Sequence, residues 1–77
     1  MMDLIPIMFK VETQYGEIKT YRTSFWSLDE EPGEAFLTEC KRTILNRLPK
    51  TEKLVGDPVF YSYHVKYEQE IKQYEWR

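Results

Sequence analysis

The segment from Glu34 to Leu48 carries apolar side chains at the spacing of an amphipathic helix, and Pro49 follows it directly. At about 100° per residue these side chains fall on one stripe centred near Leu37, Cys40 and Ile44. Proline ends a helix because it lacks the backbone N–H and clashes with the preceding turn. The pattern therefore predicts one helix, which has to bury its stripe against another element, and β-rich runs on both sides make that element a sheet.

The first β-rich run lies near the N-terminus, where apolar and polar residues alternate. Ile5, Ile7, Phe9 and Val11 share one parity, which is typical of a strand with one buried face. Pro6 suits an edge strand or the first residues of a strand, because it cannot donate to the ladder. A second run covers residues 18–26. The two runs predict a β-hairpin.

The loop of this hairpin decides which residues face each other. A two-residue loop, Tyr15-Gly16, mixes polar and apolar residues on each face. A three-residue loop from Gln14 to Gly16 keeps one face apolar and gives Gly16 the left-handed position that such loops need. We expect the second register, which places Phe9 opposite Tyr21, Ile7 opposite Thr23, and Ile5 opposite Phe25.

A third strand is predicted over residues 59–67, after a turn at Gly56-Asp57-Pro58. The tail, residues 68–77, fits either a short helix or a strand, and we favour a last strand or an extension of the third. The sequence thus predicts a single α+β domain over residues 1–77. It has a small antiparallel sheet of three or four strands with one helix packed across one face, in the order β-β-α-β or β-β-α-β-β.

Composition narrows the classes of function. The formal net charge of -2 gives no reason to expect a polyanion or an anionic membrane surface as partner. A single cysteine, Cys40, forms no internal disulfide, and with the single histidine, His64, it offers no multi-cysteine zinc site. The N-terminal run has no basic segment before it, so we expect no signal peptide. We expect a cytoplasmic protein that binds no membrane and no cofactor.

Known catalytic motifs are missing from the sequence. Cys40 and His64 could pair as nucleophile and base, yet the position of Cys40 on the apolar stripe favours a core residue. The acids at residues 29–31 and Glu34 could bind a cation, but carboxylates also favour the positive end of a helix dipole. We therefore expect a protein that is not an enzyme.

Protein binding is the function that the sequence favours. Six Tyr and two Trp in 77 residues are too many for a small core, and exposed aromatic rings are common at interfaces. In size and character the chain resembles small inhibitors made by bacteriophages and other mobile elements, which block a host or cellular protein by covering its functional surface. The predicted partner-binding residues are Asp29, Glu30, Glu31, Glu34, Tyr61, Tyr63, Tyr67, Tyr74 and Trp76.

The alternative is a module for single-stranded nucleic acid, which would stack bases on Tyr61, Tyr63 and Tyr67. The sequence has no RNP-like run with glycines and basic residues, and the slightly negative charge also disfavours this function. Three questions stay open at this point: whether the protein is a monomer or a homodimer, whether Tyr74 and Trp76 pack inward, and which face of the third strand meets the helix.

Overall fold

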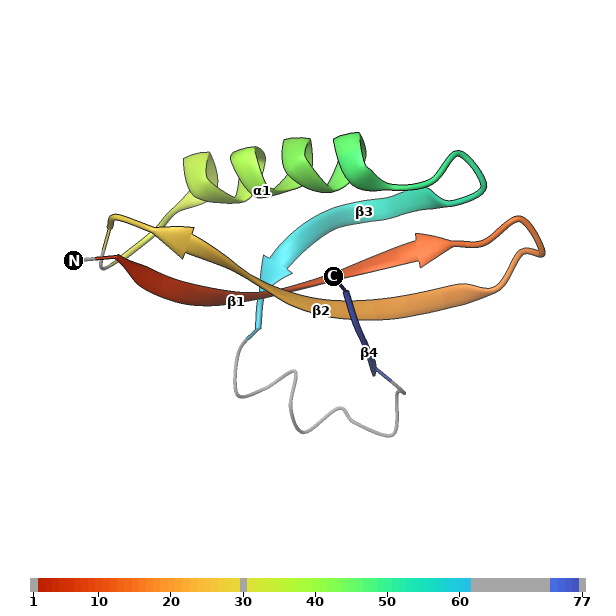
Figure 1. Cartoon of the computed structure of the whole chain (residues 1–77), viewed down its shortest axis with the longest axis horizontal. Helices are drawn as coiled ribbons and strands as arrows, with labels where there is room; N and C mark the ends of the chain where they lie inside the picture. The colour runs from red at the N-terminus through yellow and green to blue at the C-terminus, as the bar shows by residue number, and fades with distance from the viewer. Residues whose placement is uncertain (1, 30, 62–72, 77) are drawn as a thin grey trace.

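The computed structural model describes residues 2–29, 31–61 and 73–76. Its elements follow the order β1 (Asp3–Glu12), β2 (Ile18–Ser27), α1 (Glu34–Arg47), β3 (Lys53–Phe60) and β4 (Gln73–Glu75). The strands form one sheet in the order β3-β1-β2-β4, and α1 runs across one face of it, above β3 (Figure 1). The α+β class is confirmed, and the predicted helix packs on the sheet as α1.

The β1–β2 hairpin has the predicted register. Phe9 faces Tyr21, Ile7 faces Thr23, and Ile5 faces Phe25. Gly16 takes a φ of 76°, in the left-handed region that a side chain disfavours. The hydroxyl of Thr13 closes the loop by accepting the backbone N–H of Tyr15 at 3.3 Å and that of Glu17 at 3.2 Å. The register thus follows from the loop chemistry and the apolar alternation together.

The core lies between β1 and α1. Ile7, Phe9 and Val11 from β1 are buried, as are Cys40 and Ile44 from α1. The helix stops at Leu48, whose N–H donates to the carbonyl of Ile44 at 2.9 Å, and Pro49 follows. Leu45, also on an apolar position of the predicted helix, is 53% exposed. The buried stripe is therefore narrower than the sequence pattern.

The third strand differs most from the prediction. It spans Lys53–Phe60, so Gly56, Asp57 and Pro58 lie within a strand and form no turn between elements. Met8 pairs with Val59 and Lys10 with Val55, which leaves three β3 residues against one of β1. Glycine, aspartate and proline are typical of turns, and they also suit this irregularity, because a bulge needs left-handed or kinked backbone as well. Gly56 indeed has a φ of 69°.

The buried face of β3 is set by this irregularity. Leu54 packs against the core cluster, Pro58 is buried, and Phe60 stacks on Phe36 of α1 with ring centroids 6.2 Å apart. Tyr61 follows the end of β3. The rest of the predicted strand, residues 62–67, lies outside the described residues.

Two further findings concern the sheet order. β1 is an interior strand, so of the two positions that suit Pro6, an edge strand or the first residues of a strand, the structure shows the second. Proline is tolerated here because Pro6 lies in the first half of β1, just beyond Ile7, the last β1 residue whose Cα is in register with β3. The tail forms a strand at Gln73–Glu75, as favoured, and it runs parallel to β2. The sheet is therefore mixed, where the sequence suggested an antiparallel one.

Candidate functional site

The sheet face opposite α1 carries exposed apolar side chains. Because Ile7 and Phe9 point toward the helix, the alternate residues of β1 and their partners point away from it. On that side Leu4 lies opposite Trp26, and the two are 52% and 62% exposed. We call this surface the open face, and its apolar residues are Leu4, Ile18, Trp26, Val55 and Val59. Of these residues Leu4 and Trp26 are direct neighbours across the hairpin, and an exposed apolar patch on a small protein commonly marks an interaction surface.

A hollow of about 540 Å³ lies at one end of the open face. Leu4 and Pro6 of β1 and Arg22 and Ser24 of β2 line it, together with Tyr61, Glu75 and Trp76 from the segments on either side. The hollow brings together two predicted site residues, Tyr61 and Trp76, that are well separated along the chain. It mixes apolar walls with one cation and one carboxylate, the composition of a recognition surface.

Tyr61 is held in place on the side of β3. Its backbone N–H donates to the carbonyl of Pro6 at 3.0 Å, which prolongs the pairing of β3 with β1 by one bond. The guanidinium of Arg22 lies over the Tyr61 ring, 5.2 Å from its centroid. Arg22 thus covers one face of the ring that the nucleic-acid alternative needs for base stacking.

Tyr74 and Trp76 pack inward. Trp76 contacts Phe9 edge-on at 5.2 Å between centroids, and the guanidinium of Arg47 lies 5.0 Å from the centre of its ring. Tyr74 lies beside Tyr21 at 5.9 Å. Both are half-buried. These rings attach β4 to the domain, and the exposed tryptophan of the open face is Trp26 instead.

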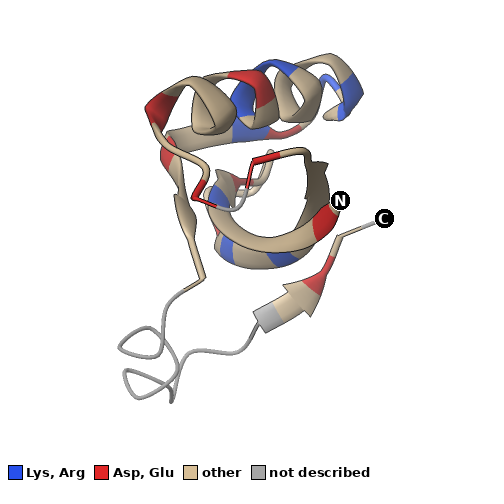
Figure 2. Ribbon diagram, turned by 90° about the vertical axis from the view of Figure 1, so that its left-hand side faces the viewer, with Lys and Arg blue, Asp and Glu red and all other residues tan. Residues whose placement is uncertain are grey.

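The acidic turn between β2 and α1 is exposed at Asp29, Glu31 and Glu34. It starts where the hydroxyl of Ser27 accepts the N–H of Asp29 at 3.1 Å and donates to the Asp29 carbonyl at 3.2 Å. Acidic residues also occur at the start of β1 and in β4 (Figure 2). The turn adjoins the Trp26 end of the open face. The other predicted site residues, Glu30, Tyr63 and Tyr67, lie outside the described residues.

Cys40 is a core residue, as predicted, and is 2% exposed. Burial raises the pKa of its thiol from 9.0 to about 11, so the reactive thiolate is strongly disfavoured at neutral pH. Within residues 2–29, 31–61 and 73–76, no group of three or more His, Cys, Asp or Glu side chains is placed to hold a metal ion.

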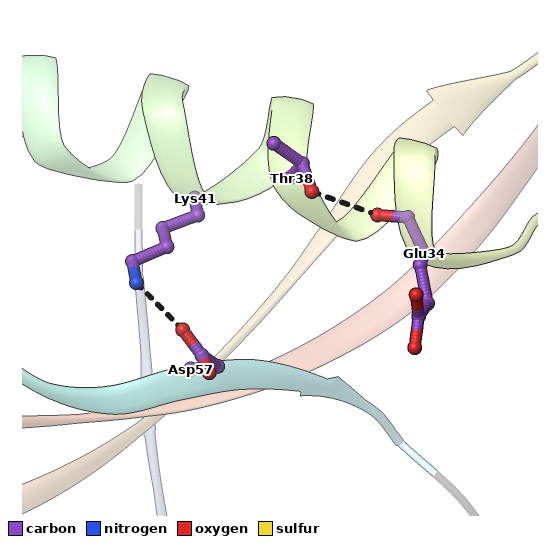
Figure 3. Close-up of polar contacts among 4 residues, drawn as sticks. All are labelled: Glu34, Thr38, Lys41 and Asp57. Atoms are coloured by element: carbon purple, nitrogen blue, oxygen red, sulfur yellow. Dashed lines mark hydrogen bonds and ion pairs between the residues drawn. The ribbon is translucent and has the colours of Figure 1, made fainter.

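A second hollow, of about 350 Å³, lies between α1 and the irregular part of β3. Lys41 donates to Asp57 there at 2.6 Å, and the hydroxyl of Thr38 donates to the Glu34 carbonyl at 3.0 Å (Figure 3). The ion pair is at the surface, since the two side chains are 41% and 76% exposed. It links helix to strand and gives no arrangement of nucleophile and base.

Trp26 and Leu4 are not among the site residues predicted from the sequence. The signal for both was available in the alternation: Leu4 and Trp26 belong to the parity that the apolar stripe of β1 leaves for solvent. The predicted set followed the tyrosine-rich third strand instead, most of which lies outside the described residues.

Comparison with protein-family models, with curated proteins and with solved structures gives no match for this chain. Among the described residues, no helix is long and apolar enough to cross a membrane.

Proposed function

We propose that this chain is a non-enzymatic protein-binding domain that acts as an inhibitor, covering the functional surface of a host or cellular protein in the manner of small phage or mobile-element proteins. The observation that supports this most is the open face, where Trp26 is 62% exposed and lies opposite the half-exposed Leu4. Tryptophan is the side chain most enriched among residues that dominate binding energy at interfaces.

The surroundings of Trp26 fit this role. The hollow is lined by Leu4, the residue opposite Trp26, and it offers a partner side chain a recess walled by Tyr61 and Trp76. A partner that removes apolar surface from water gains roughly 25 cal/mol per Å² before the costs of association. The exposed acids at Asp29 and Glu31 add a field that speeds the approach of a basic partner.

The experiment is affinity capture of the tagged full chain from cell lysate, with and without nuclease, read by mass spectrometry. Two variants, Trp26→Thr and Leu4→Thr, remove apolar surface from the open face while keeping residues that suit a strand. A matched control, Leu45→Gln, removes an apolar side chain of similar exposure from the outer side of α1.

We expect one stoichiometric protein that survives nuclease, is retained by the Leu45 variant and is lost from both open-face variants. Inhibition of the activity of that protein by the purified domain completes the test. Material that disappears with nuclease contradicts the proposal and favours nucleic acid. Capture that is equal for all variants also contradicts it, because the open face then has no part in binding.

A further inference from the structure

The outer edge of β2 is only partly paired. β4 pairs with β2 from Thr20 to Arg22, and the N–H of Trp76 donates to the carbonyl of Arg22 at 3.0 Å. The Arg22 carbonyl therefore points away from β1. Because alternate residues of a strand direct their N–H and C=O groups to the same side, Ser24 and Trp26 also direct theirs outward. No strand among the described residues pairs with this part of β2.

The two outer edges of the sheet differ in chemistry. The β3 edge carries Lys53, the irregularity at Gly56 and Asp57, and Pro58, all features that discourage the addition of another strand. The β2 edge from Thr23 to Ser27 reads Thr-Ser-Phe-Trp-Ser and has no lysine, proline, glycine or register shift. The β3 edge is thus protected against the addition of a further strand, and the β2 edge is regular enough to pair with one.

We propose that an extended, cationic segment of the partner protein adds to the sheet as a strand along Thr23–Ser27, beside the end of β4. This inference rests on the proposed function, since it states how the partner is held. Backbone bonds to Ser24 and Trp26 supply the pairing, and alternate side chains of the guest lie over the open face next to Trp26.

The charged side chains around the Thr23–Ser27 edge favour an added strand of a particular charge. Asp3 lies opposite Ser27, Asp29 follows the end of β2, and Glu75 lies opposite Arg22. Glu31 is exposed in the same turn as Asp29. Four carboxylates thus accompany the edge, together with one cation, Arg22, which lies in register with Glu75. Lysine or arginine side chains on the guest complement this field, whereas acidic ones are repelled.

A second copy of this chain is a poorer guest. Antiparallel self-pairing of the segment Thr23–Ser27, centred on Phe25, carries the Asp29 of each copy toward β4 of the other. Glu75 lies there, in register with Arg22. Like charges then meet at both ends of a short ladder, which disfavours the pairing.

The test uses the full chain, labelled with ¹⁵N, and a synthetic capped hexapeptide of alternating arginine and valine. Amide hydrogen exchange is followed residue by residue by NMR. One control peptide has glutamate in place of arginine. A second keeps the side chains but is N-methylated on the backbone nitrogens of one edge, which removes its donors. In the protein, Ser24→Pro removes an outward N–H without touching the ladder to β1.

We expect the cationic peptide to slow exchange at the amides of Ser24 and Trp26 by at least about tenfold at saturation. The glutamate peptide should bind at least about tenfold more weakly, and N-methylation should weaken binding roughly thirtyfold through two lost hydrogen bonds. Ser24→Pro should bind more weakly while the amides of β1 keep their shifts. If this variant fails to fold, the N-methylated peptide still decides the case.

Protection within Lys53–Phe60 in place of β2, equal binding of the glutamate peptide, or no protection at all would overturn the inference. Protection of Ser24 and Trp26 that rises with protein concentration alone would also overturn it, because the guest is then a second copy. Capture that depends on Trp26 and Leu4 without peptide protection leaves the proposed function standing and removes only the strand addition. Peptide protection without any captured protein contradicts the proposed function.

Discussion

The indole of Trp76 meets the phenyl ring of Phe9 edge-on, with ring centroids 5.2 Å apart and planes at 90°. Phe9 is one of the most deeply buried residues of the domain, and Arg47 covers the Trp76 ring from the end of α1. β4 has only three residues in the sheet. Its attachment therefore depends on this aromatic contact as well as on its short ladder.

Replacing Trp76 with alanine should lower the free energy of unfolding by about 2 kcal/mol, because a half-buried ring is lost from the core cluster. Trp26→Ala is the matched control: that ring is 62% exposed, and its loss should change stability by less than about 0.5 kcal/mol. Urea unfolding followed by far-UV circular dichroism measures both. Equal losses in the two variants would contradict the inward packing of Trp76.

The buried thiol of Cys40 makes stability depend on alkaline pH. Its pKa is raised from 9.0 to about 11 in the folded chain, so the unfolded chain loses the proton first. The free energy of unfolding is unaffected below about pH 9 and should fall as the pH rises toward 11, by up to roughly 2–3 kcal/mol. The difference between wild type and Cys40→Ala across this range isolates the thiol. A constant difference would show that the folded pKa is not raised.

Gly16 should resist replacement by alanine. Its φ of 76° is costly for a residue with a Cβ, so Gly16→Ala should destabilise the hairpin by about 1 kcal/mol even though nothing lies within 4 Å of an added Cβ. Gly16→Asn should cost less, since asparagine tolerates this region.

Gly33, the N-cap of α1, has a φ of -113°, and Gly33→Ser should be neutral or slightly stabilising. Thermal unfolding ranks the three variants.

The ion pair of Lys41 and Asp57 should contribute little. Its two side chains are 41% and 76% exposed, and exposed pairs are typically worth well under about 1 kcal/mol. A double-mutant cycle with Lys41→Met and Asp57→Asn measures the coupling, which should shrink further in about 1 M salt. A coupling above about 2 kcal/mol that salt leaves unchanged would show a desolvated pair instead.

The acidic turn should act on the rate of association. Reversing Asp29 and Glu31 to lysine should slow binding to the captured protein severalfold at low salt and have little effect at high salt. Glu39→Lys, on the outer side of α1, is the matched control and should change the rate less. Surface plasmon resonance separates the two rate constants. Faster association of the reversed variant would favour an anionic partner such as nucleic acid.

Local chemistry made the hairpin and the helix predictable. The left-handed requirement at Gly16 and the alternation of Ile5, Ile7 and Phe9 allow only one register that keeps an apolar face. Pro49 and the stripe through Cys40 and Ile44 define the helix equally well. Each of these features is decided by neighbours within a few residues, which is the range that a sequence pattern reports.

The start of the third strand was predicted too late in the sequence because Gly56-Asp57-Pro58 has two interpretations. These residues favour a turn when taken alone, and they are also suited to an irregularity in an edge strand. The choice depends on the pairing of β3 with β1, a long-range contact with no local signature. For the same reason no local pattern indicates that β4 runs parallel to β2 or that Trp76 packs on Phe9.

The irregular, proline-containing β3 has a consequence for assembly. A sheet that grows by strand addition needs a receptive edge on both sides of every unit, and in the part of the chain that the structure describes the regular edge lies along β2 alone. Once a partner strand pairs with the β2 edge, the edge of the sheet that stays exposed on the other side is the irregular edge of β3. With the proposed strand addition, the domain would therefore terminate a growing sheet and would not propagate it into a fibril.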